Sequence, residues 1–195
     1  MLISALATAG AQQPQIITIR LFNRSKIASA VVLRGEKKSE DLLGRAGIRV
    51  LWLNCPGTEK CSDPPNQRSL IVTILKEGSA IRGGDVLGLA LEDASGSGTY
   101  CYIFEDRLNT VAGQTHLPTA RLLAYAMAHE LGHLLKGGHS HSHAGIMSAV
   151  WLTPQLQDIA RDALAFTTED AQIMLSRLER VNESVQTSAI VEPNK

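Results

Sequence analysis

The sequence predicts a single α+β domain: a small, twisted, mixed sheet, a helix backing it, a buried central helix and further helices near the C-terminus. The chain has 195 residues, enough for one domain with its own core. Hydrophobic residues make up 44% of it, as is normal for a globular protein. The predicted elements come in the order strand, helix, strands, hairpin and helices, which is typical of the α+β class.

Strand patterns occur mainly in the first 110 residues. Residues 15–22, QIITIRLF, alternate between apolar and polar side chains, as a strand with one buried face does. The apolar runs at 47–55 and 69–75 predict two more strands. Residues 85–93 and 99–108 flank the turn sequence A-S-G-S-G, so they predict a hairpin.

Helical patterns are expected at 25–46, 118–136, 154–165 and 168–182. The second of these is rich in Ala and Leu on most of its faces, which predicts a buried helix. Thr167 and Asp170 have the spacing of an N-terminal capping pair for the last helix.

The two ends of the chain differ from the domain between them. Residues 1–11 are apolar and end in the A-G-A of an A-x-A cleavage pattern, so we expect a signal peptide, shortened at its start, and a secreted or periplasmic protein. Residues 12–185 form the predicted domain, and residues 186–195 a polar, frayed tail.

Charge and hydropathy exclude several classes of partner. The formal net charge is zero, which gives no electrostatic reason to expect nucleic acid or an anionic membrane. No apolar run approaches the roughly 18 residues of a membrane span. Nothing in the sequence sets an oligomeric state, and a monomer is assumed.

The three cysteines have different surroundings. Cys55 and Cys61 lie six positions apart in a loop rich in Gly and Pro, where a disulfide would hold a segment with little other structure. The alternative is a pair of free thiols in a cytosolic protein. Cys101 lies in the apolar run TYCYIF and is expected to be a buried free thiol.

Residues 129–147, HELGHLLKGGHSHSHAGIM, contain the strongest candidate for chemistry. His129 and His133 are four residues apart on the predicted buried helix, so both imidazoles project from one face and can meet one metal ion. Glu130 lies about 100° around the helix, where it can reach a water molecule beside that ion and accept its proton. The alternative interpretation is that these are structural histidines in the core, with their ring nitrogens hydrogen-bonded to other protein groups.

A hydrolytic zinc site needs a third protein ligand. The candidates are His139, His141 and His143, which follow Gly137 and Gly138. A chain reversal at these glycines, in a left-handed conformation, would bring one of the three back to the metal.

One glycine and one further histidine complete this region. Gly132 lies in the helix interior, where glycine costs about 1 kcal/mol relative to Ala, and we expect a following loop to pass close to it. His116 lies in a loop before the helix and is expected to be structural or exposed.

The pattern HELGH…H followed by GIM resembles the metzincin clan of zinc endopeptidases, with its H-E-x-x-H-x-x-G-x-x-H motif and methionine turn. His129, Glu130 and His133 match directly, and His139 has the clan's spacing for the third ligand. Met147 matches the methionine that packs beneath the metal. One departure is Lys136, which stands where the clan has glycine; we therefore expect the helix to run one residue further and turn at Gly137.

The segment is also similar to small secreted bacterial metallopeptidases with the pattern HEIGHLLLG…SHS…GIM. Their histidine after the glycine turn aligns with His141, which this resemblance favours over His139; His143 is then solvent-facing. The resemblance implies one catalytic Zn²⁺, a polypeptide substrate and Glu130 as general base. It also suggests that the strand in 99–108 is a sheet edge that pairs with extended substrate.

Non-catalytic readings of the same residues stay open. The tract H-S-H-S-H would suit a zinc-scavenging module, but a scavenger needs neither Glu130 nor a buried helix. RNA-processing metallohydrolases with three histidines resemble this spacing, but they lack a glutamate after the first histidine. An inactive, zinc-binding relative of a peptidase is the remaining alternative.

Overall fold

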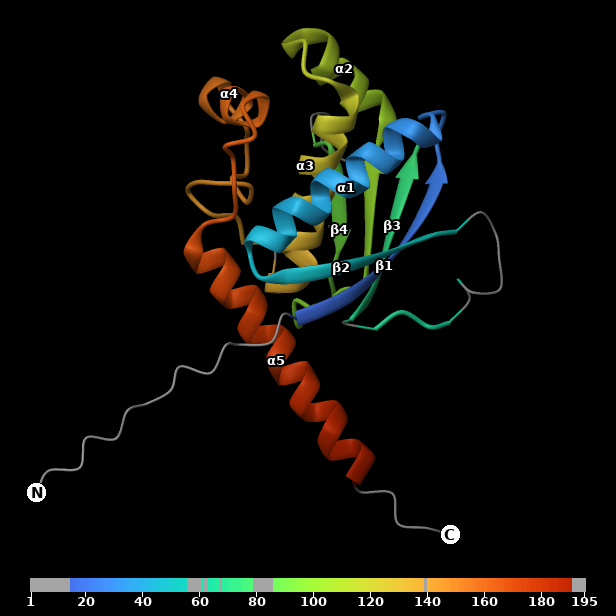
Figure 1. The fold of residues 1–195 in the computed structure, drawn as a ribbon, viewed down its shortest axis with the longest axis vertical. Helices are drawn as coiled ribbons and strands as arrows, with labels where there is room; N and C mark the ends of the chain where they lie inside the picture. Colours follow the sequence, from blue (N-terminus) through green and yellow to red (C-terminus); the bar gives the residue numbers. More distant parts are fainter. Residues whose placement is uncertain are drawn as a thin grey trace, which may run out of the picture.

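The computed structural model of the chain describes residues 15–55, 61, 63–66, 68–78, 86–138 and 140–190, with side chains described as far as residue 181. In this part of the chain, helices pack over one face of a twisted sheet (Figure 1). The alternation along the first strand shows which face is covered: Ile17 and Ile19 are fully buried, whereas Ile16 is 42% exposed.

The sheet has four parallel strands and one antiparallel edge strand. The strands are β1 Gln15–Arg24, β2 Ile48–Asn54, β3 Ser69–Leu75, β4 Gly88–Leu91 and β5 Tyr100–Phe104. Their order across the sheet is β2-β1-β3-β5-β4. Only β4 runs antiparallel to its neighbour, because it is joined to β5 by the tight turn of the predicted hairpin.

The helices within the described residues are α1 Ser29–Arg45, α2 Glu105–Thr115, α3 Thr119–Lys136, α4 Thr153–Ala160 and α5 Thr168–Ile190. Helices α1 and α3 pack against each other and against the sheet, and their apolar side chains share one core cluster with those of the strands. The predicted fold class is therefore confirmed.

One helix is absent from the prediction. The second hairpin strand was expected to reach residue 108, but β5 ends at Phe104 and α2 begins at Glu105. The two acidic residues of the first turn, Glu105 and Asp106, favour a helix start because of their charge near its N-terminus. The side chain of Asp106 also accepts a hydrogen bond from the backbone N–H of Gly78, which ties this start to the end of β3.

The predicted edge strand is also wrong. Strand β5 lies between β3 and β4, so the run TYCYIF is an inner strand, and the edge next to α3 is β4. Sequence alone does not reveal this difference, because strand order depends on pairings between residues far apart in the chain.

The last two helices differ from their predicted lengths. Helix α4 ends at Ala160, five residues early, and Asp162 just beyond it has a φ of +58°. Helix α5 begins at Thr168, directly after Thr167, and the predicted Thr167–Asp170 capping pair forms; the helix continues to Ile190, past the expected start of the tail.

The cysteines behave as expected. Cys55 and Cys61 form a disulfide, with Cα atoms 5.9 Å apart, and Cys101 is a buried free thiol. The predicted signal peptide, residues 1–11, lies outside the described residues. Among the helices that are described, none combines the length and apolar character needed to cross a membrane.

Candidate metal centre

Helix α3 presents His129 and His133 on one face, as their spacing predicts. The two Nε2 atoms lie 3.1 Å apart. Two nitrogen ligands at about 2.0–2.1 Å from one tetrahedral zinc ion would be separated by about 3.3 Å. The helix therefore holds both imidazoles close to the separation that a shared ion requires.

A hydrogen bond fixes the orientation of the His129 ring. Its Nδ1 lies 2.7 Å from the backbone carbonyl oxygen of Ile146, so the Nδ1–H donates and Nε2 is left to face His133. Burial lowers the pKa of His129 to about 4, and this outweighs the opposing effect of the bond to Ile146. His129 is thus neutral at neutral pH, which is the form that binds a metal.

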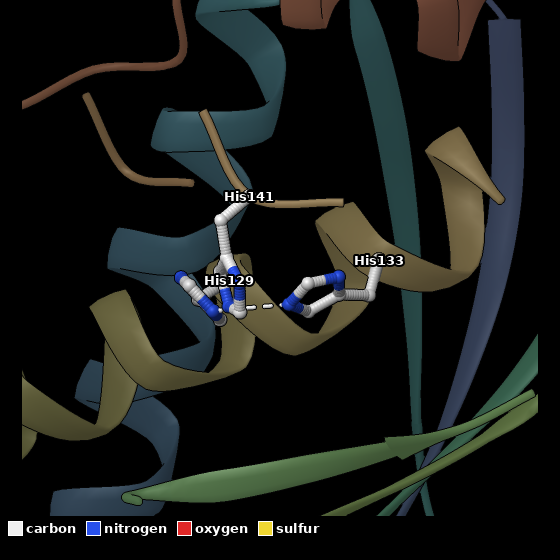
Figure 2. A group of neighbouring side chains, drawn as sticks. All are labelled: His129, His133 and His141. Atoms are coloured by element: carbon white, nitrogen blue, oxygen red, sulfur yellow. Dashed lines mark hydrogen bonds between the residues drawn. The ribbon is translucent and has the colours of Figure 1, made fainter. Parts of the chain in front are cut away.

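His141 completes a group of three imidazoles. One ring nitrogen from each of His129, His133 and His141 lies within 4.8 Å of the other two. Figure 2 shows the three rings pointing toward one another, two from α3 and the third from the segment that follows it. We name residues 140–148, which carry His141 and Met147, the return segment.

Among the described residues, the two remaining histidines, His116 and His143, do not belong to this group. His143 and His116 are exposed, and His116 ends α2 with a φ of +57°. His139, the alternative third ligand, lies outside the described residues.

The turn between α3 and the return segment begins where the departure from the clan pattern suggests. Helix α3 runs to Lys136, and Gly137 follows with a φ of +72° and a ψ of 135°. The positive φ was expected, but the ψ value is extended rather than left-handed helical. A Cβ atom on Gly137 would overlap the guanidinium of Arg177, which donates a hydrogen bond to the Lys136 carbonyl oxygen at 3.2 Å.

The missing side chain of Gly132 makes room for Met147. Met147 is fully buried, and a Cβ atom built on Gly132 would overlap its Sδ and approach Phe166 to 3.0 Å. The expectation that a later loop passes close to Gly132 is confirmed. The methionine of the return segment therefore packs directly against the helix that carries His129 and His133.

Glu130 lies between α3 and the edge strand. It is 7% exposed, and its carboxylate accepts a hydrogen bond from the backbone N–H of Ala90. A Cβ atom on Gly88 would come within 2.6 Å of Glu130 Cγ, so glycine at that position leaves space for this side chain. Burial is the main reason that the pKa of Glu130 is raised to about 8; the bond from Ala90 opposes the shift and nearby Glu92 adds to it.

A cleft of about 500 Å³ runs past Glu130 and the three histidines. Its remaining walls come from β4 and the residues before it, from α2, and from the chain after Met147. The larger apolar lining residues are Val86, Leu87, Leu89, Val111, Val150, Trp151 and Leu156. The site thus combines three imidazoles and one carboxylate with a largely apolar cleft.

Two features of the site were not predicted. The contacts of Gly88 and Ala90 with Glu130 depend on the position of β4, which the sequence pattern does not give. The second feature is a buried ion pair between Lys136 and Asp170. Both residues stood out in the sequence, one as a departure from a motif and the other as a helix cap, but nothing linked them.

Several solved structures share this fold, among them the following two. An archaemetzincin from Methanopyrus kandleri has a TM-score of 0.53 and 16% identity, over 89% of this chain and 99% of its own. A zinc-dependent peptidase from Methanocorpusculum labreanum (strain Z) has the same TM-score and identity, over 80% of this chain and 99% of its own. No family model matches the sequence, and no curated protein does. At this identity the similarity establishes the fold alone.

Proposed function

We propose that this protein is a zinc-dependent endopeptidase. One observation carries the proposal: the imidazoles of His129, His133 and His141 converge beside Glu130, in a cleft bordered by a sheet edge. The names of the two fold neighbours, an archaemetzincin and a zinc-dependent peptidase, agree with it.

The donor set suits one zinc ion. Three neutral imidazoles are a common ligand set for catalytic zinc, and a fourth position is then left for the reactants. Here His129, His133 and His141 all line the cleft. A zinc ion bound by them would polarise the scissile carbonyl and lower the pKa of water at that position.

Glu130 supplies the proton transfers. Its carboxylate accepts a proton from the attacking water and then passes it to the nitrogen of the leaving amine. Burial favours the protonated form of Glu130 in the metal-free site, and a zinc ion bound beside it would favour the ionised form that accepts a proton. The Ala90 N–H and the space beside Gly88 keep the carboxylate at the cleft.

Strand β4 is the surface on which an extended substrate would bind. It is the edge of the described sheet and lines the cleft, so a polypeptide can add as a further strand through backbone hydrogen bonds. This role replaces the one expected for residues 99–108. The apolar walls, including Val150 and Trp151, favour an apolar substrate side chain beside the scissile bond.

We also propose that residues 12–185 act outside the cytoplasm, after removal of residues 1–11. The Cys55–Cys61 disulfide supports this proposal, because disulfides persist in oxidising compartments.

The change Glu130→Gln tests the function. It removes the proton acceptor and keeps the size of the side chain, so casein hydrolysis should fall by about 10²–10⁴-fold, while elemental analysis still finds one zinc per chain. Glu40→Gln, on the exposed face of α1, is the matched control and should hydrolyse casein at the parental rate. Parental activity in Glu130→Gln would refute the mechanism. A wild-type protein that binds zinc but cleaves no peptide would favour the non-catalytic alternative.

A further inference from the structure

A polar cluster connects the return segment to the end of α3 and the start of α5. Lys136, the last residue of α3, places its Nζ 2.6 Å from Oδ1 of Asp170 in the first turn of α5. The two side chains are only 5% and 1% exposed. The hydroxyl of Ser142 donates to the same Asp170 oxygen at 2.6 Å and accepts a hydrogen bond from Lys136 Nζ at 3.1 Å.

Asp170 itself is held in one orientation. Its other oxygen, Oδ2, accepts a hydrogen bond from the Thr167 hydroxyl at 2.7 Å, and its backbone N–H donates back to that hydroxyl at 3.1 Å. This pair caps the N-terminus of α5, where a negative charge is favourable. The carboxylate that receives Lys136 and Ser142 is therefore fixed to the start of a helix.

Ser142 is the direct sequence neighbour of His141, and it is attached at two points. Its side chain bonds to Asp170 and Lys136, while its backbone N–H donates to the carbonyl oxygen of Met147 at 2.8 Å. Met147 in turn packs against Gly132 of α3. His141 itself is exposed, and the contacts of its neighbour Ser142 hold the backbone beside it.

Stability alone does not explain a buried ion pair. Moving two charges out of water costs about as much as their attraction returns, and well-packed apolar residues often replace such pairs without loss. A buried pair can instead fix geometry, because a buried charge that loses its partner is strongly destabilising and the two side chains must therefore stay in contact. Here the geometry in question is the path of the return segment relative to the end of α3.

We propose that Lys136, Asp170 and Ser142 form a positioning cluster that holds His141 in reach of the ion bound by His129 and His133. This inference rests on the proposed zinc site. It also gives a reason for the departure from the clan pattern: by extending α3 one residue, the chain places the Lys136 ammonium where it can meet Asp170 and Ser142.

The test measures zinc affinity rather than activity. Ser142→Ala removes the hydroxyl and leaves the Lys136–Asp170 pair in place. We expect its zinc dissociation constant, measured by competition with a chromophoric chelator, to rise by about 10–100-fold, as is usual when a group that orients a ligand is lost. With Co²⁺ as the probe, the visible absorption bands should change in intensity and position, because the third imidazole no longer holds its place.

Two further variants separate positioning from general stability. Ser142→Thr keeps a hydroxyl and should restore most of the zinc affinity. Ile48→Val removes one methylene group from the buried strand β2, away from the histidines, and should lower the melting temperature without changing the zinc dissociation constant. Lys136→Met with Asp170→Leu removes both charges together, and its folded form should bind zinc as weakly as Ser142→Ala does.

The outcomes distinguish this inference from the proposed function. A wild-type protein that binds no zinc would defeat both. A wild-type protein that binds zinc tightly, together with a Ser142→Ala protein that has the same dissociation constant and the same Co²⁺ spectrum, would overturn the positioning role alone.

Discussion

Helix α3 and the return segment hold their histidines in different ways. In α3, backbone hydrogen bonds set the distance between His129 and His133, and most of the surrounding side chains are buried. In the return segment, His141 is exposed and its position depends on contacts from distant parts of the chain, namely Asp170 of α5 and the packing of Met147 on Gly132.

This difference shows which interactions set the positions of the three histidines. Two of the proposed ligands lie on the helix and take their relative positions when the helix forms. The third is added by tertiary contacts, so its placement is the step that other changes in the protein can disturb. Predictions that alter one region and spare the other test this division.

The largest effect is expected from the ligands themselves. His133→Ala and His141→Ala should each weaken zinc binding by more than about 100-fold, the upper range for groups that only orient ligands. His139→Ala should leave the zinc dissociation constant unchanged. Chelator competition on the three variants checks this. Loss of zinc from the His139 variant, with full retention in the His141 variant, would assign the third ligand to His139.

The next effect concerns the contact between Glu130 of α3 and Gly88 of the edge strand β4. Gly88→Ala places a methyl group within 2.6 Å of Glu130 Cγ and of the Tyr102 carbonyl oxygen, so the carboxylate must move. A displacement of about 1 Å costs about 10²-fold in rate. We expect kcat on a peptide substrate to fall by that amount while the zinc content stays at one per chain. Parental kcat would show that Gly88 does not position Glu130.

The contact between the two regions should respond to Gly132→Ala. In an open helix this change stabilises by about 1 kcal/mol. Here the new methyl group would overlap Met147 Sδ and approach Phe166, and such overpacking costs about 1–3 kcal/mol. The packing cost wins, so denaturant unfolding should show a lower free energy of unfolding than that of the parent. Ala substituted at Gly44 in α1, where a Cβ meets nothing within 4 Å, is the control and should stabilise.

The smallest effect is a pH dependence that belongs to α3. In the metal-free protein the folded pKa of Glu130 is about 8, raised from 4.5, so the folded state keeps a proton that the unfolded chain loses. The contribution of Glu130 to the free energy of unfolding therefore falls as pH rises from 4.5 through 8. His129, whose folded pKa is about 4 against 6.5, acts in the opposite sense, but only below pH 6.5.

Between pH 6.5 and 8, Glu130 contributes to the pH dependence of the free energy of unfolding and His129 does not. The free energy of unfolding of the metal-free protein should fall by up to about 1.4 kcal/mol per pH unit there. Urea unfolding at several pH values checks this. Glu130→Gln cannot titrate and should lack the slope; an equal slope in both proteins would mean that another group causes it.

The same division explains what the sequence could predict. The positions of His129, Glu130 and His133 follow from helical spacing, and the space at Gly132 follows from the cost of glycine inside a helix. Local patterns do not contain strand order, so the edge at β4 and the support that Gly88 and Ala90 give Glu130 were missed. Helix α2 was missed because its polar sequence, EDRLNTVAGQT, lacks a strong apolar period.

The third histidine of the site, His141, was predicted only in part. Residue spacing left His139, His141 and His143 open, and only a resemblance to secreted bacterial metallopeptidases favoured His141. The physical reason is that a loop after two glycines has many paths. The chosen path depends on a lysine and an aspartate 34 residues apart, and no local pattern joins them.

A crystal structure of the zinc-loaded protein, with anomalous data collected at the zinc absorption edge, tests the central claim most directly. We predict one strong anomalous peak at bonding distance from Nε2 of His129, Nε2 of His133 and a ring nitrogen of His141. A zinc-loaded crystal with no peak among these rings, or with the peak bound by His139 in place of His141, would contradict it.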